Sequence, residues 1–349
     1  MMISQVDAVI SKFWLVTMEV LFKIVRQQQN SSPSVQTYLL QAEPSNTILD
    51  CLNRIKWEQD GTLAFRKNCR NTICGSCAMR INGRSALACK ENIGSEISRS
   101  QHILSPEQEL NQIPEIIVAP LGNMPVIKDL IVDMNSFWNN LEAVTPYVST
   151  AARQVPEREF LQTPEERSRL DQTGNCIMCG ACYSECNARE VNPEFVGPHA
   201  LAKAYRLVAD SRDQQTENRL ENYHEGTQGV WGCTRCLYCD SVCPMEVAPL
   251  AQITKIKQEI LARKQASDSR TIRHRKVMID LVKSGGWIDE RQFGLQVVGN
   301  YFQDLKGLLS LAPLGLRMLC RGKFPLTFES SPGTQQVRNL IESVQQSEG

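Results

Sequence analysis

The sequence predicts an α+β fold, in which a small domain of strands and one helix precedes an all-helical domain and a C-terminal helical extension. Apolar runs bounded by turn residues dominate the first third of the chain, whereas apolar residues recur at helical spacing from about residue 137 onward. Fourteen cysteines are the second observation, because twelve of them form three tight clusters within the first two parts. We place the domain boundaries at residues 18–133, 134–268 and 269–349.

The N-terminal domain is expected to hold strands around one helix and one cysteine loop. A helix is indicated where apolar residues recur at helical spacing in NTILDCLNRIKWEQ. The expected strands are EVLFKIV, TYLLQAE, AMRI and ALAC. The segment PLGNMPVIKDLIVD (120–133) looks like a connector to the next domain.

The rest of the chain is expected to be helical. In the second domain the expected helices are EREFLQTPEERSRLDQ, PHALAKAYRLVADSRD and APLAQITKIKQEILARKQ. The third part carries a basic cluster at 270–276, an apolar segment at 307–328 and a short polar tail. The basic cluster is typical of a solvated helix face. Together with the apolar segment it is equally consistent with docking on an anionic membrane or a partner subunit.

The composition excludes several functions. Lysine plus arginine (38) balances aspartate plus glutamate (38), which gives no reason to expect a nucleic-acid partner. The first residues lack the basic region of a secretory signal, and no later stretch is long and apolar enough to span a bilayer. We therefore expect reduced thiols, which favour metal or redox chemistry over disulfides. Met18 is a possible true start, with residues 1–17 as a weakly amphipathic leader.

The first cysteine cluster has the plant-type spacing for a [2Fe–2S] cluster. Its C-x4-C-x2-C-x11-C pattern is formed by Cys69, Cys74, Cys77 and Cys89. Small residues in CRNTICGSCAM allow backbone N–H groups to approach the sulfurs. A four-thiolate zinc site is the alternative, but zinc prefers two C-x2-C hooks and only one is present.

The other two clusters share the C-x2-C-x2-C-x3-C run of two-cluster ferredoxins, in which the fourth cysteine binds the opposite cluster. One [4Fe–4S] cluster is assigned to Cys176, Cys179, Cys182 and Cys243, and the second to Cys186, Cys233, Cys236 and Cys239. Paired C-x2-C zinc sites are the alternative, but the third cysteine of each run would then have no place among the four tetrahedral ligands. Pro244 follows the second run as the pattern expects, whereas Asn187 takes that place after the first.

The remaining candidate ligands receive no metal role. Cys51 and Cys320 are expected to be small buried hydrophobes. The scattered histidines, His102, His199, His224 and His274, have no ligand spacing to one another.

One plant-type pattern followed by two crossed runs resembles the iron–sulfur subunit of succinate dehydrogenase/fumarate reductase. The strings LAFRKNCRNTICGSCAM, NPEFVGPHALAKAYRLVADSRD and CDSVCPMEVAP carry the resemblance, which covers roughly residues 18–265. It implies a plant-type ferredoxin (β-grasp) domain and an all-α two-cluster ferredoxin domain. It also implies a peripheral subunit on the cytoplasmic face of the membrane, which passes electrons from the FAD of a flavoprotein to quinone. Such a subunit of succinate dehydrogenase (quinone) has no dicarboxylate site of its own. Fumarate reductase, or a subunit serving another flavoprotein dehydrogenase, is the alternative.

Three departures from the common members of that family alter these expectations. Common members lack a cysteine at the position of Cys236 and hold a [3Fe–4S] cluster. Cys236 favours a second [4Fe–4S] cluster here, and the alternative is a [3Fe–4S] cluster with Cys236 as a nearby cysteine that is not a ligand. Thr234 and the string NAREVNP stand where quinone-site histidine and tryptophans are usual, so the resemblance does not carry the family's usual quinone site over to this chain. The segment beyond residue 270 resembles the tail of heterodisulfide-reductase-C-type proteins. That suggests a membrane anchor or a heterodisulfide-reductase-B-like partner, which would supply Cys-Cys-Gly motifs that this chain lacks.

Overall fold

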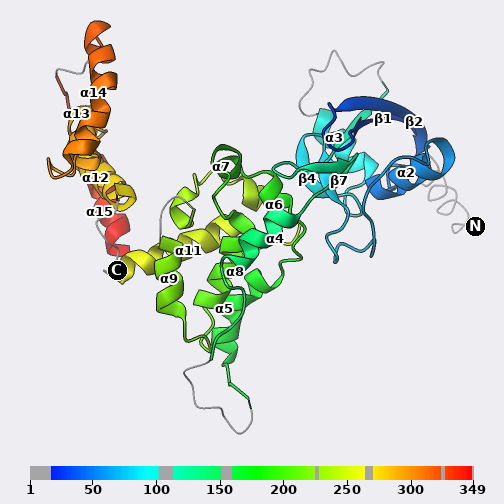
Figure 1. The fold of residues 1–349 in the computed structure, drawn as a ribbon, viewed down its shortest axis with the longest axis horizontal. Helices are drawn as coiled ribbons and strands as arrows, with labels where there is room; N and C mark the ends of the chain where they lie inside the picture. The colour runs from blue at the N-terminus through cyan, green and yellow to red at the C-terminus, as the bar shows by residue number, and fades with distance from the viewer. Residues whose placement is uncertain are drawn as a thin grey trace, which may run out of the picture. The chain divides into compact units, whose positions relative to one another are not determined.

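The computed structural model describes residues 17–101, 113–150, 159–224, 228–263, 270–323 and 327–347. The chain divides into two compact units, which meet at residues 260 and 261. The expected order of a mixed N-terminal domain followed by helices is confirmed (Figure 1). The proposed leader and His102 lie outside the described residues.

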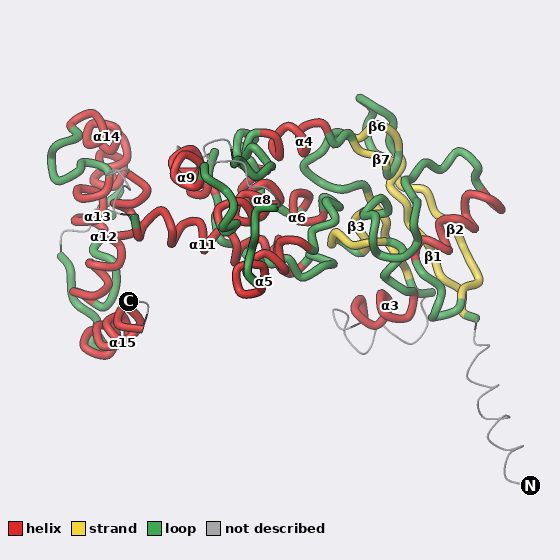
Figure 2. The backbone as a smooth tube through the Cα atoms, turned by 90° about the horizontal axis from the view of Figure 1, so that it is seen from below, coloured by secondary structure: helices red, strands yellow, loops and turns green. Residues whose placement is uncertain are grey.

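A five-stranded mixed sheet forms the N-terminal domain (Figure 2). Its strands are β1 (Met18–Arg26), β2 (Ser34–Ala42), β3 (Ala78–Ile81), β4 (Arg84–Leu87) and β5 (Glu115–Ala119). They lie in the order β2-β1-β5-β3-β4. β1 pairs antiparallel with β2 and parallel with β5, while β3 pairs antiparallel with β4 and β5. The predicted strand pair at the start of the chain is therefore correct.

The buried face of the sheet follows from the alternation of side chains along β1. Val20, Phe22 and Ile24 are buried at every second position, as a half-buried strand requires. They share a core with the apolar side chains of α2 (Ile48–Arg54), which continues into a π-helical turn at Ile55–Gln59. The predicted helix over this segment is confirmed, including the burial of its Cys51.

Three sequence expectations in this domain need correction. The segment 120–133 is more than a connector, because β6 (Val126–Lys128) and β7 (Ile131–Val132) pair as a short hairpin. The last strand was expected to end on Cys89. It ends at Leu87 instead, and Cys89 lies in the following turn. The chain then forms α3 (Ile93–Gln101), for which no helix was predicted.

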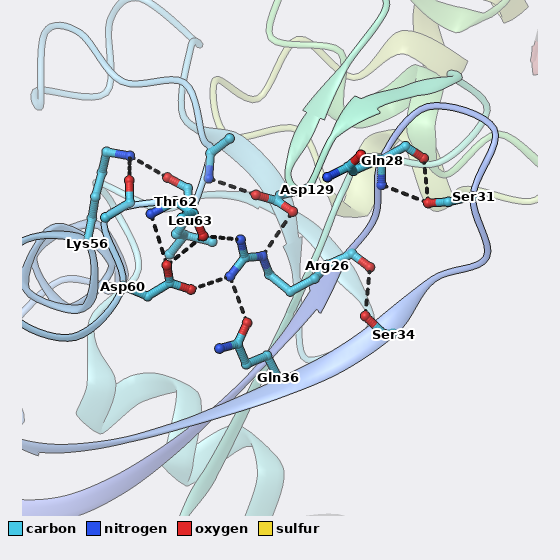
Figure 3. A network of polar contacts seen from close by, with 12 residues as sticks. Arg26, Gln28, Ser31, Ser34, Gln36, Lys56, Asp60, Thr62, Leu63 and Asp129 are labelled. Carbon is cyan, nitrogen blue, oxygen red and sulfur yellow. Dashed lines mark hydrogen bonds and ion pairs between the residues drawn. The ribbon is translucent and has the colours of Figure 1, made fainter.

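An arginine at the end of β1 ties three segments of the N-terminal domain together (Figure 3). The Arg26 guanidinium bonds Asp60 at 2.5 Å and Asp129 at 2.9 Å. It also donates to the Tyr38 hydroxyl at 2.7 Å. Asp129 in turn accepts the Ala64 N–H at 2.9 Å, so this buried carboxylate joins the β6–β7 turn to the loop that leads to the first cysteines.

Arg26→Met is expected to lower the free energy of unfolding by about 3 kcal/mol, because it leaves the Asp129 carboxylate buried without its cation. The side chain of Asp129 is only 4% exposed. The matched control is Lys23→Met on the same strand as Arg26. It breaks an exposed ion pair with Glu115 of β5 and should cost about 0.5 kcal/mol. Urea unfolding of the anaerobic holoprotein, followed by circular dichroism, measures both. Equal losses in the two variants would contradict the structural role of Arg26.

The residues that the structure describes in the rest of the first unit form helices, turns and loops. The α-helices are α4 (Asn135–Glu142), α5 (Pro164–Gly174), α6 (Ala181–Ser184), α7 (Asn187–Val191), α8 (Pro198–Val208), α9 (Thr216–His224), α10 (Tyr238–Ser241) and α11 (Pro249–Ala262). The three predicted helices are α5, α8 and α11. α5 begins later than expected, at Pro164, because Thr163 forms a capping box with Glu166.

The second unit holds the remaining helices: α12 (Arg270–Gly285), α13 (Glu290–Val297), α14 (Leu305–Cys320) and α15 (Thr334–Ser347). Its small core contains Val277, Leu281 and Val297, and α12 packs against α13 and α15. The polar tail is therefore helical. Cys320 is exposed, so its predicted burial is wrong: α14 contains no buried residue. Among the described helices, none is long and apolar enough to span a membrane.

Candidate functional site

The first cysteine loop curls its backbone around two sulfurs. The N–H groups of Asn71 and Cys74 each donate to Cys69 Sγ at 3.3 Å, and the Cys69 N–H points to Cys74 Sγ at 3.5 Å. Arg70 and Thr72 have φ values of 57° and 59°, which tighten the loop. These N–H groups are placed to stabilise negative charge on the sulfurs.

The other two cysteines of this group lie against the same loop. The Cys77 carbonyl accepts the N–H of Ala88, which holds the loop against the turn carrying Cys89. Burial raises the pKa of Cys77 to about 12. Burial also opposes ionisation of Cys74, but hydrogen bonds from Ser76 and Cys69 outweigh it and lower the pKa to about 6.

Two cavities in the helical part collect the other eight cysteines. The central cavity is lined by Cys176, Cys179, Cys182 and Cys243. The distal cavity is lined by Cys186, Cys233, Cys236 and Cys239. Each cavity thus contains three cysteines from one run and the last cysteine of the other. The remaining lining is mostly apolar, including Phe137 and Val247 in the central cavity and Phe195 and Ile253 in the distal one.

The two runs repeat one backbone conformation. Met178 and Gly180 have φ values of 54° and 83° in the first run, and Arg235 and Leu237 have 60° and 68° at the equivalent places in the second. A short helix follows each pair, α6 in the first run and α10 in the second. Cys236 therefore occupies in the distal run the backbone position that Cys179 occupies in the central run.

Burial keeps several of these thiols protonated in the absence of a compensating cation. It raises the pKa of Cys179 and of Cys186 to about 11. Cluster ligands are thiolates, so iron binding in these cavities would release protons and stabilise the fold. Within the described ranges, no group of three or more His, Cys, Asp or Glu side chains is placed to hold a single metal ion.

The first loop and the central cavity are in backbone contact. Gly75 has φ 69°, and a Cβ atom there would lie 2.9 Å from Cys179 Cα and 3.1 Å from the Ile177 carbonyl oxygen. Only glycine permits this approach. From the sequence, the small residues of this loop were expected to let backbone N–H groups approach the loop's own sulfurs. The sequence did not predict that Gly75 also lets the loop contact the backbone of the central cavity.

A polar cluster fixes the sheet against the C-terminal end of α6, the short helix that contains Cys182. Ser85 Oγ on β4 lies 2.8 Å from Ser184 Oγ and 2.7 Å from Glu185 Oε1. Arg80 on β3 forms an ion pair with Glu185 at 3.0 Å. Sequence reasoning missed these residues, because single serines carry no pattern that links segments 99 positions apart.

A buried histidine also lines the central cavity. The His199 ring stacks on Phe137 with centroids 3.9 Å apart, and its Nε2 lies 2.9 Å from the Phe137 carbonyl oxygen. Nε2 must carry the proton to donate to that carbonyl. His199 thus anchors α8 to α4 beside the cysteines, a role that its isolated place in the sequence did not reveal.

The first loop and the distal cavity both reach the molecular surface. Cys69 is exposed, and the neighbouring Ile73 is 64% exposed. At the distal cavity, Cys236 is exposed, and Leu237 and Tyr238 are 60% and 52% exposed. All four cysteines of the central cavity are half-buried. The first loop and the distal cavity thus each present an exposed cysteine, and the central cavity presents none.

Comparisons with known proteins agree with this geometry. Residues 21–139 match the model of a 2Fe-2S iron-sulfur cluster binding domain, and residues 172–247 match a 4Fe-4S dicluster domain. The chain is 35% identical over 245 residues to succinate dehydrogenase [ubiquinone] iron-sulfur subunit 3, mitochondrial, of Arabidopsis thaliana. That match covers 69% of this chain and 74% of the relative. It is 34% identical over 230 residues to the fumarate reductase iron-sulfur subunit of Escherichia coli, a match that covers 66% of this chain and 87% of the relative.

A solved structure shares the fold. A chain of the Mycobacterium smegmatis Sdh1 complex in the apo form aligns with a TM-score of 0.61 at 22% identity, covering 73% of this chain and all of that chain. The two family-model matches together cover both cysteine-bearing regions. The chain therefore belongs to the family of succinate dehydrogenase and fumarate reductase iron–sulfur subunits.

Proposed function

We propose that this chain is the electron-transfer subunit of a succinate dehydrogenase, in which it holds one [2Fe–2S] and two [4Fe–4S] clusters. The observation that carries the proposal is the crossed composition of the two cavities, each with three cysteines of one run and one of the other. Four thiols in an apolar cavity suit a cubane cluster.

The ligand assignment follows the three cysteine groups. The [2Fe–2S] cluster is assigned to Cys69, Cys74, Cys77 and Cys89, the central [4Fe–4S] cluster to the central cavity and the second [4Fe–4S] cluster to the distal cavity. We keep the domain boundaries at residues 18–133, 134–268 and 269–349. The first is a plant-type ferredoxin (β-grasp) domain and the second an all-α two-cluster ferredoxin domain. The mixed sheet, with β1 parallel to β5, supports the first of these assignments.

When bound, the three clusters supply one-electron redox centres. The chain's own residues bind them, set their charge environment and exclude water. The N–H groups of Asn71 and Cys74 stabilise negative charge on Cys69 Sγ. Gly75 brings the first loop against the backbone of Cys179, which keeps neighbouring centres close enough for electron tunnelling.

The exposed ends of this arrangement suit two partners. We assign the binding surface for an FAD-bearing flavoprotein to the exposed loop that contains Cys69. The distal cavity, with exposed Leu237 and Tyr238, faces the electron acceptor. That acceptor is quinone, reached at a membrane anchor or a heterodisulfide-reductase-B-like subunit, with the chain peripheral on the cytoplasmic face. Fumarate reductase uses the same parts in the opposite direction and is the second candidate.

The complex, purified anaerobically with its partners, tests the proposal. About ten irons per chain are expected, with low-temperature EPR signals of one [2Fe–2S] and two [4Fe–4S] clusters. Succinate should reduce a dye through the co-purified flavoprotein. Cys69→Ser should remove the [2Fe–2S] signal, whereas Cys320→Ser, at an exposed cysteine outside the three groups, should change none. Stoichiometric zinc without iron would reject the proposal.

A further inference from the structure

Helix α14 presents an apolar stripe that the second unit does not cover. Its members recur at positions i, i+4, i+7, i+11 and i+14, which places them on one face of the helix. They are Leu305, Leu309, Ala312, Leu316 and Leu319, and each is exposed. Leu309 and Leu316 are 71% and 66% exposed.

A different face of α14 makes the contacts with its own unit. Leu308 approaches Gly299, where a Cβ atom would lie 2.5 Å from the leucine Cδ2, and Leu311 approaches Gly294 on α13. These glycines let α14 pack closely against the segment that precedes it. The exposed stripe is therefore not needed to hold α14 in place.

The charges beside the stripe all have one sign. Lys306, Arg317, Arg321 and Lys323 are exposed, and no aspartate or glutamate occurs between Leu305 and Lys323. Lys306, Arg317 and Arg321 are separated by 11 and 4 positions, so they share a face beside the leucines. Leucines flanked by cations alone match a helix that lies in the plane of an anionic membrane surface.

The turn before α14 adds two aromatic rings. Tyr301 and Phe302 are 57% and 65% exposed, and both have positive φ values, 53° and 73°. Backbone in this region is unfavourable for large side chains. Aromatic rings are favoured at the depth of lipid headgroups, so this strained turn places them where an interfacial helix would use them.

We propose that α14 binds directly to an anionic lipid bilayer, lying in its interface with the Leu309–Leu316 stripe inserted and the cations at the headgroups. A helix of 16 residues spans about 24 Å, too short for the hydrocarbon core, which agrees with a helix that lies on the membrane. This attachment adds to any anchor subunit and does not depend on the identity of the flavoprotein.

Vesicle flotation with the purified full-length holoprotein, without partner subunits, tests the proposal. Binding to vesicles of phosphatidylcholine with phosphatidylglycerol is expected, with much weaker binding to phosphatidylcholine alone and loss at high salt. Replacing both Leu309 and Leu316 by glutamate should reduce partitioning at least tenfold. The matched control is Leu161→Glu, at a leucine of the first unit that is 80% exposed, and it should bind as the wild type does.

The charges are tested separately. Lys306→Gln with Arg317→Gln should reduce binding to anionic vesicles by about fivefold for each cation removed, with little change on neutral vesicles. Unchanged EPR signals and circular dichroism confirm that the exposed substitutions leave the fold intact. Absence of binding by the wild-type chain, or full binding by the double-glutamate variant, would overturn the proposal. Binding that requires an added partner subunit would overturn it too and would assign the stripe to a protein interface.

Discussion

Replacing Cys236 by alanine is expected to convert the distal centre from a [4Fe–4S] to a [3Fe–4S] cluster. Cys236 lies in the distal cavity on the same backbone conformation that presents Cys179 in the central one. It is also the exposed member of its group, so an iron bound to it would lie on the solvent side of the cavity. Without this thiolate one iron of a bound cubane would have no protein ligand, and we expect it to be lost on oxidation.

EPR of the oxidised protein measures the conversion, because a [3Fe–4S] signal should appear with about one spin per chain. A rise in the reduction potential of this centre should accompany it. Cys51→Ala is the control, since Cys51 is buried in the N-terminal domain and should alter neither signal. A [3Fe–4S] signal already at full strength in the wild type would show that Cys236 is not a ligand.

Gly75→Ala is expected to slow electron transfer between the [2Fe–2S] centre and the central centre several-fold. The added methyl group would lie 2.9 Å from Cys179 Cα, so the first loop and the central cavity must move apart. Tunnelling rates fall steeply with distance, and the magnetic interaction between the two reduced centres should weaken in parallel. Rapid-freeze EPR after mixing the complex with succinate measures the rate.

The control for Gly75→Ala is Gly83→Ala. Gly83 has φ 83° but no atom within 4 Å of its virtual Cβ, so alanine there brings the same backbone strain without a clash. That strain costs about 1 kcal/mol in either variant. Similar slowing in both variants, or a normal transfer rate in Gly75→Ala with both centres assembled, would contradict the positioning role.

The sequence predicted what depends on local pattern. The strand pair β1–β2, the helices α2, α8 and α11 and the grouping of twelve cysteines all follow from spacing along the chain. The grouping of Cys243 with Cys176 was expected because the C-x2-C-x2-C-x3-C run has a known crossed topology. The same cysteines line one cavity in the structure.

What the sequence did not predict depends on contacts between distant segments. The Ser85–Ser184 contact and the Arg26–Asp129 ion pair join residues 99 and 103 positions apart. No pattern in the sequence indicates that these residues are partners. The exposure of Cys320 was missed for a related reason. Its burial was expected because an isolated cysteine is usually a small buried hydrophobe, but only one face of α14 packs against its own unit.

The crossed cavities also impose an order on biosynthesis. The distal cavity has its full set of thiols only after Cys239 has left the ribosome, and the central cavity only after Cys243 has. The first cysteine group, whose last member is Cys89, is complete far earlier in translation. Iron delivery to the two cubane positions must therefore await nearly all of the first unit, and a polypeptide interrupted before Cys239 would be left with two incomplete pockets.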